Sequence, residues 1–152
     1  MPITPDEARA LLARWQPTLR LADWDIDLRL VAAPWRKSGD VKVDLDERKA
    51  VLLLNAEQAP EHLEEVVVHE LIHLRLYAMD QMLVQLLDAV FGSDADEPRR
   101  AFAETQFMTL LESTTEDLAK ALLAASGSST PLTFERLRDE VEREVGPGAT
   151  AG

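Results

Sequence analysis

The chain has 152 residues, contains no cysteine and carries a formal net charge of −12 at pH 7. Its length predicts one compact domain over residues 1–152, and the lack of cysteine excludes disulfides, thiolate metal ligands and cysteine nucleophiles. The negative charge argues against nucleic-acid binding, which needs a basic surface. Neither a secretory signal nor an apolar run long enough to span a membrane is visible, so we expect a cytoplasmic protein that does not bind membranes.

The first third of the chain predicts a helix followed by three strands. A helix is expected from Thr4 to about Leu21, because Thr4 can cap it, Pro5 suits its first position and apolar residues follow at helical spacing. Alternating apolar and polar residues predict strands over 24–31 and 41–46. The continuously apolar stretch 50–55 predicts a third strand of the kind that is covered on both faces. The polar residues 46–49 predict an antiparallel hairpin between the last two strands.

The rest of the chain predicts helices. One opens at Pro60 and is expected to reach about Met79, and the apolar pattern from Met82 to Phe91 either extends it or forms a separate short helix. After a break at 92–98 we expect a long helix to about residue 125. The core of the domain is thus expected to span about residues 4–125. A last helix around 133–145 and a disordered tail over 146–152 follow. These elements predict an α+β fold with a small mixed or antiparallel sheet.

The sequence His69-Glu70-Leu71-Ile72-His73 lies inside the helix that follows Pro60. Residues four apart share one face of a helix, so both imidazoles can bind one metal ion. Glu70 points about 100° away around the axis, within reach of a water that the metal activates, where a general base is required. The competing interpretation is a pair of ordinary core or surface histidines. Because the surrounding residues are apolar, these polar groups need partners there, and we predict one Zn²⁺ per chain.

The third metal ligand is predicted to be a carboxylate, because no histidine follows His73 and catalytic zinc usually takes three protein ligands. The downstream candidates are Asp80, Asp88, Asp94, Asp96, Glu97, Glu104, Glu112 and Glu116. Glu104 is preferred because a helical wheel places it on the same side as Phe107 and Met108, where a carboxylate needs a cationic partner. The alternative for Glu104 is partial exposure or an ion pair with an arginine such as Arg75.

These features together resemble the gluzincin metallopeptidases, especially the small minigluzincin-like forms, over roughly residues 20–115. The matching parts are the opening helix, the short strands, the helix with His69 and His73, and a later helix with Glu104 followed by Phe107 and Leu110. The resemblance implies a zincin-like domain in which an edge strand of the sheet binds an extended peptide by main-chain pairing. The strand that fits best consists of Val51, Leu52, Leu53, Leu54 and Asn55.

The resemblance also implies two properties outside the metal site. A terminal segment can block the cleft and make such an enzyme latent, and here that segment would be residues 126–152. Larger gluzincins use a downstream histidine to stabilise the transition state, and this chain has none. Tyr77 is the candidate for that role, with simple core packing as the alternative.

The predicted function is therefore that of a zinc metalloendopeptidase that hydrolyses a peptide or protein substrate. His69, His73 and Glu104 are the predicted ligands and Glu70 the predicted general base. The alternative is a non-catalytic, metal-stabilised binding or regulatory module, whose zinc is closed off by a fourth ligand such as Asp80 or Asp88. A glutamate beside the first histidine favours the enzyme, because it serves no structural zinc site. The sequence leaves the substrate, the cleavage specificity and the oligomeric state open.

Overall fold

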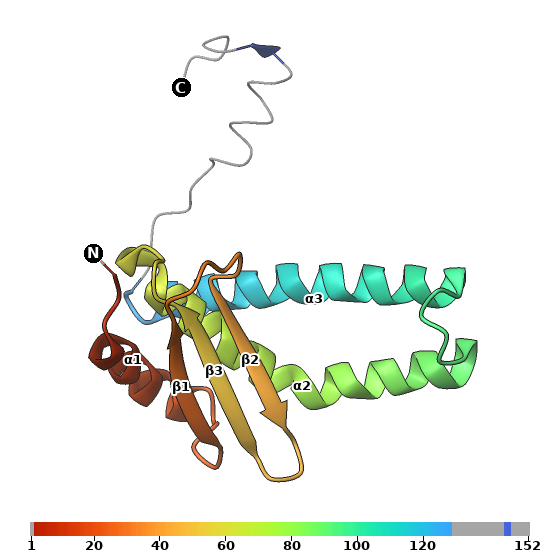
Figure 1. The fold of residues 1–152 in the computed structure, drawn as a ribbon, viewed down its shortest axis with the longest axis horizontal. Coiled ribbons are helices and arrows are strands. Elements are labelled where there is room, and N and C mark those ends of the chain that lie inside the picture. Colours follow the sequence, from red (N-terminus) through yellow and green to blue (C-terminus); the bar gives the residue numbers. More distant parts are fainter. Residues whose placement is uncertain (1, 129–144, 147–152) are drawn as a thin grey trace.

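A computed structural model describes residues 2–128, 145 and 146 of the chain. Its elements are α1 (Pro5–Thr18), β1 (Asp25–Val31), β2 (Gly39–Asp44), β3 (Lys49–Asn55), a short 3₁₀ helix η1 (Pro60–His62), α2 (Leu63–Phe91) and α3 (Pro98–Ala125). Figure 1 shows the sheet beside a long hairpin formed by α2 and α3. The predicted α+β class is confirmed. Apart from residues 145 and 146, the predicted helix at 133–145 and the tail fall outside the described residues, as does most of the blocking segment.

The opening helix α1 begins where its capping residues predict. Thr4 and Glu7 form a capping box, because the Glu7 N–H donates to Thr4 Oγ1 at 3.3 Å and the Glu7 carboxylate accepts from the Thr4 N–H at 2.8 Å. Pro17 lies in the last turn, and the helix ends one residue later. The buried indole of Trp15 donates its N–H to Glu64 of α2 at 2.8 Å. These contacts fix α1 against the start of α2.

The sheet has the strand order β1–β3–β2, with β1 parallel and β2 antiparallel to β3. The predicted hairpin between the last two strands is therefore confirmed, and the sheet is mixed. The prediction that Val51–Asn55 forms an edge strand is wrong, because this segment lies in β3, which pairs with a neighbour on each side. Its continuous apolar character is typical of such a central strand. A peptide cannot extend the sheet at β3.

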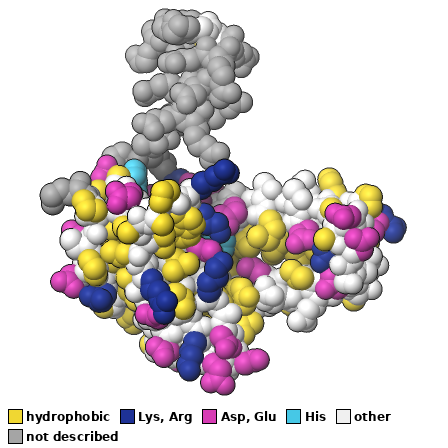
Figure 2. Space-filling view, in the orientation of Figure 1, with side chains coloured by type: hydrophobic (Ala, Val, Ile, Leu, Met, Phe, Trp, Pro, Cys, Tyr) yellow, Lys and Arg dark blue, Asp and Glu magenta, His cyan; other side chains and the backbone are white. Residues whose placement is uncertain are grey.

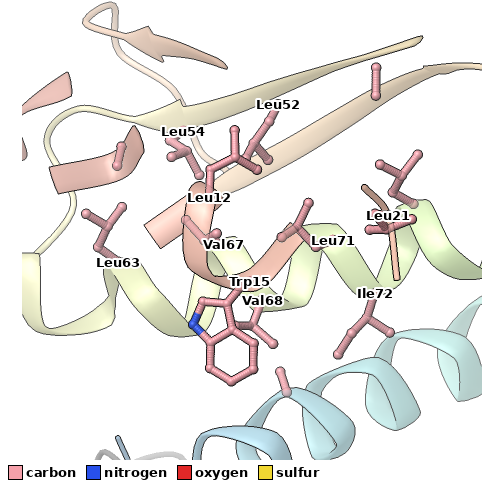
Figure 3. Packing of buried hydrophobic residues seen from close by; sticks show 14 of the residues in the cluster. Leu12, Trp15, Leu21, Leu52, Leu54, Leu63, Val67, Val68, Leu71 and Ile72 are labelled. Atoms are coloured by element: carbon pink, nitrogen blue, oxygen red, sulfur yellow. The ribbon is translucent and has the colours of Figure 1, made fainter. Parts of the chain in front are cut away.

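The hydrophobic core lies between the sheet and the first half of α2. Figure 3 shows Leu52 and Leu54 of β3 above α2, with Trp15 of α1 beside that helix. The α2 residues Val67, Val68 and Leu71 are fully buried there. The helix continues unbroken to Phe91, so the apolar pattern after Met82 extends it. The core thus holds the first half of α2 rigidly, while its second half runs out along α3 (Figure 1).

None of the helices in the described ranges is long and apolar enough to cross a membrane.

Candidate metal centre

Three side chains from α2 and α3 bring potential metal ligands together. The Nε2 atoms of His69 and His73 are 3.1 Å apart. Glu112 places Oε1 at 2.9 Å from Nε2 of His73 and Oε2 at 3.4 Å from Nε2 of His69. Four atoms bound tetrahedrally to zinc at its usual ligand distances would lie roughly 3.3 Å apart. The group therefore has the size that one metal ion requires, and it is the only group of this kind in the described part of the chain.

The core fixes the histidines, and α3 supplies the carboxylate. Leu71, between the two histidines in sequence, is fully buried against the sheet, which sets the rotation of α2. The side chains of His69 and His73 are only 20% and 16% exposed, whereas that of Glu112 is 57% exposed. Burial lowers the pKa of His73, although the carboxylate of Glu112 acts in the opposite direction. Burial thus favours the neutral imidazole of His73, which is the form that binds a metal ion.

Glu104, the predicted third ligand, lies elsewhere on α3. Its Oε2 accepts a hydrogen bond from Nη1 of Arg100 at 2.7 Å, and Arg100 also donates from Nη2 to Asp88 of α2 at 2.7 Å. The side chain of Arg100 is 8% exposed. This buried arginine therefore links the second half of α2 to the first half of α3. The structure places Glu112 beside the histidines in place of Glu104. Glu104 does form an ion pair with an arginine, as the alternative interpretation expected, but this arginine is Arg100 and not Arg75.

The geometry of the hairpin explains this difference. In two antiparallel helices, residues at equal distances from the connecting loop face each other. His73 lies 18 residues before the end of α2 at Phe91, so it faces the part of α3 around Glu116, one turn from Glu112. Glu104 is only six residues from the start of α3 and faces position 85 of α2. The lengths of the two helical patterns and of the loop between them are therefore the sequence signal that shows which part of α3 faces His69 and His73.

Glu70 is buried beside His69, His73 and Glu112, which we call the metal-ligand group, and 8% of its surface is exposed. Strand β2 approaches it so closely that a Cβ atom on Gly39 would lie 2.9 Å from Cγ of Glu70 and 2.7 Å from Cγ1 of Val66. Burial and the nearby carboxylates of Asp40 and Glu112 raise the pKa of Glu70 to about 8. Once deprotonated, a carboxylate with a raised pKa is a stronger proton acceptor than an exposed one.

A cavity of about 570 Å³ connects these residues. Residues 37–41 line it from the β2 side, and α2 and α3 contribute Tyr77, Asp80, Gln81, Val84, Met108 and Leu111 beyond the metal-ligand group. Figure 2 shows histidine at this hollow, with Lys and Arg on the sheet side and hydrophobic side chains on the hairpin side. Tyr77 thus lies on the cavity wall, and its role in stabilising a transition state stays a prediction.

The carboxylates around the cavity differ in their partners. Asp40 binds Lys42 at 2.7 Å and Lys37 at 3.3 Å. Partial burial acts to raise the pKa of Asp40, but the hydrogen bonds from the two lysines outweigh it and the pKa is lowered. Among residues 2–128, 145 and 146, no lysine or arginine pairs with Asp80. Burial and the charge of Glu112 raise its pKa.

Replacing Gly39 with alanine is expected to displace Glu70. The added methyl group would overlap Glu70 and Val66 and should lower the free energy of unfolding by about 1–3 kcal/mol. Metal binding should persist, because the ligands lie on α2 and α3. Urea unfolding and metal content check both expectations. Gly92→Ala is the matched control: it strains a helix end at φ 85° but has no atom within 4 Å of its new Cβ, so only stability should fall.

The raised pKa of Glu70 predicts how the stability of the metal-free protein depends on pH. Between pH 4.5 and about 8 the folded state keeps a proton on Glu70 that the unfolded state has lost, so the free energy of unfolding falls as pH rises through this range. Each unit of pKa difference contributes about 1.4 kcal/mol. Urea unfolding at pH 5 and pH 8 should show this loss in wild type. An equal loss in Glu70→Gln would contradict the prediction.

No protein family, curated protein or solved structure matches this chain. His69, His73 and Glu112 form a group that could hold one metal ion and that is compatible with a zincin-like site. Glu70 lines the same cavity.

Proposed function

We propose that the protein is a zinc-dependent peptidase in which His69, His73 and Glu112 bind the metal and Glu70 is the general base. The observation that carries this proposal is the position of Glu70, a buried carboxylate on the wall of the cavity that also contains the metal-ligand group. A structural metal site needs no proton acceptor, whereas hydrolysis by an activated water does.

The ligand group suits zinc. Two imidazoles and one carboxylate are a ligand set of known catalytic zinc sites, in which a fourth position remains for water. The distances of 2.9, 3.1 and 3.4 Å between the ligand atoms agree with such a site. When bound, zinc supplies a Lewis acid that polarises a peptide carbonyl and makes water more acidic.

The side chains around the group account for the remaining steps of hydrolysis. The carboxylate of Glu70 would accept a proton from the attacking water and return it to the leaving amine. The hydroxyl group of Tyr77, on the cavity wall, would donate a hydrogen bond to the oxygen that becomes negatively charged. This arrangement of one base and one hydroxyl donor is suited to the hydrolysis of a peptide bond.

Strand β2 takes the role that was expected of Val51–Asn55, because β2 is an edge strand and borders the cavity. The N–H of Asn55 donates to the carbonyl of Ser38 at 2.9 Å. In an antiparallel ladder the alternate residues Gly39 and Val41 then turn their main-chain groups toward the open edge. An extended peptide would pair with this edge and pass the metal-ligand group.

The alternative, a non-catalytic module with a closed metal site, needs a fourth protein ligand. Of the two candidates, Asp88 is held by Arg100 at 2.7 Å. Asp80 lines the cavity but does not belong to the group of mutually close ligand atoms. Within the described residues the group has three members, which supports an open site and therefore the peptidase.

The experiment that tests the proposal measures metal content and proteolysis together. Full-length protein is stripped of metal, reloaded with one equivalent of zinc and incubated with an unfolded protein substrate. Mass spectrometry of the products should reveal internal cleavage by the zinc-loaded sample and none by the metal-free sample. Stoichiometric zinc without cleavage of any peptide bond would instead support the binding module.

A further inference from the structure

The cavity continues past the metal-ligand group into the groove between α2 and α3. Its walls there are formed by Tyr77 and Val84 of α2 and by Met108 and Leu111 of α3. Asp80 and Gln81 of α2 line the cavity together with these side chains. The far end of the hairpin carries the ion cluster of Arg100, which lies beyond this part of the cavity.

Asp80 differs from the other acidic residues of the hairpin core. Asp88 and Glu104 share Arg100 as their cationic partner. Asp80 is half-buried, and within the described residues it makes neither a hydrogen bond nor an ion pair. The carboxylate of Glu112, which has the same sign, acts with burial to raise the pKa of Asp80. A carboxylate in this setting is stabilised by a cation that enters from outside.

The spacing along α2 limits what can supply that cation. Asp80 lies seven residues beyond His73 on the same side of the helix, a rise of about 10 Å. The side chain of a residue next to the cleaved bond must span most of this length, which a leucine or valine side chain cannot do. Lysine and arginine have an apolar stem of the required length and carry their charge at its end.

We infer that this part of the cavity binds the side chain of a lysine or arginine residue of a bound peptide, with the stem against Val84, Met108 and Leu111 and the cation beside Asp80. The inference rests on the proposed function, since it assumes a peptide anchored at the metal. The net charge of −12 acts in the same direction, because it attracts positively charged peptides. An apolar side chain would leave the carboxylate of Asp80 partly desolvated and unpaired.

The test uses zinc-chelating hydroxamates, because their binding requires the metal but no turnover. N-acyl hydroxamates with an arginine side chain are compared with norleucine analogues, and each is made with the side chain on either side of the chelating group. Calorimetry on zinc-loaded wild type should give at least about tenfold tighter binding of one arginine probe than of its norleucine analogue. In Asp80→Asn this ratio should fall to about one. Asp117→Asn, which removes an exposed charge of α3, should keep the wild-type ratio.

The outcomes separate this inference from the proposed function. A wild-type protein that binds zinc and both kinds of probe equally, or a preference for arginine that survives Asp80→Asn, overturns the inference alone. A preference that depends on Asp80, in a protein that cleaves no peptide, supports the inference and overturns only the hydrolytic function. Failure to bind zinc at all would overturn both.

Discussion

Replacing Glu70 with glutamine is expected to slow peptide hydrolysis by roughly a thousandfold. Glutamine has nearly the same shape as glutamate but cannot accept the proton of the attacking water. Glu70 is absent from the metal-ligand group, so zinc should remain at one per chain. The neutral amide should also be tolerated in the buried position, since burial already favours the uncharged form of this residue. Cleavage assays and zinc analysis of the same preparations measure both effects.

The control for this substitution is Glu65→Gln, which removes a carboxylate from the first turn of the same helix, outside the cavity. Its activity should stay within about twofold of wild type. Proteolysis by Glu70→Gln at the wild-type rate would mean that another group is the base, or that a contaminant is responsible. Loss of zinc together with activity would instead make Glu70 a ligand.

Replacing Glu112 with alanine is expected to weaken zinc binding by more than about a hundredfold. Removal of a group that only orients a metal ligand already costs 10–100-fold, and loss of a ligand should exceed this. The exposed side chain of Glu112 contributes little packing, so the thermal unfolding of the metal-free protein should hardly change. Competition with a chromogenic chelator gives the zinc affinity, and circular dichroism gives the unfolding temperature.

Glu104→Ala is the matched variant, because it truncates the same residue type on the same helix. It should keep the zinc affinity of wild type and lose about 1 kcal/mol of stability, since Asp88 is then the one acidic partner left to the Arg100 side chain within the described residues. The opposite result, with zinc lost from Glu104→Ala and kept by Glu112→Ala, would show that the hairpin has another register in solution.

Features that depend on neighbours in sequence were predictable. The capping box of Thr4 and Glu7 marks the start of α1, and the alternation of apolar residues marks β1 and β2. The pairing of His69 with His73 follows from one turn of helix. In each case the decisive contacts span four residues or fewer, or arise from a repeat within one element, so the local sequence contains them.

Features that depend on the meeting of distant segments were not predictable in the same way. β3 is central because β1 pairs with it in parallel, and no pattern within residues 49–55 shows where β1 will lie. The choice between Glu104 and Glu112 depends on how α3 aligns with α2. A helical wheel gives the side of a helix on which a residue lies but not its position along the axis, so it indicates Glu104 without showing which residue of α3 reaches His73.

The division of the ligands between two helices has a consequence for folding. The histidines belong to a helix that the sheet holds in place, whereas Glu112 belongs to α3, which packs along α2. A metal ion bound by all three residues would close a ring through the hairpin loop by coordinate bonds, much as a disulfide would do covalently, in a chain that has no cysteine. Free zinc would therefore stabilise the attachment of α3, and above the dissociation constant this stabilisation would grow with the logarithm of the zinc concentration.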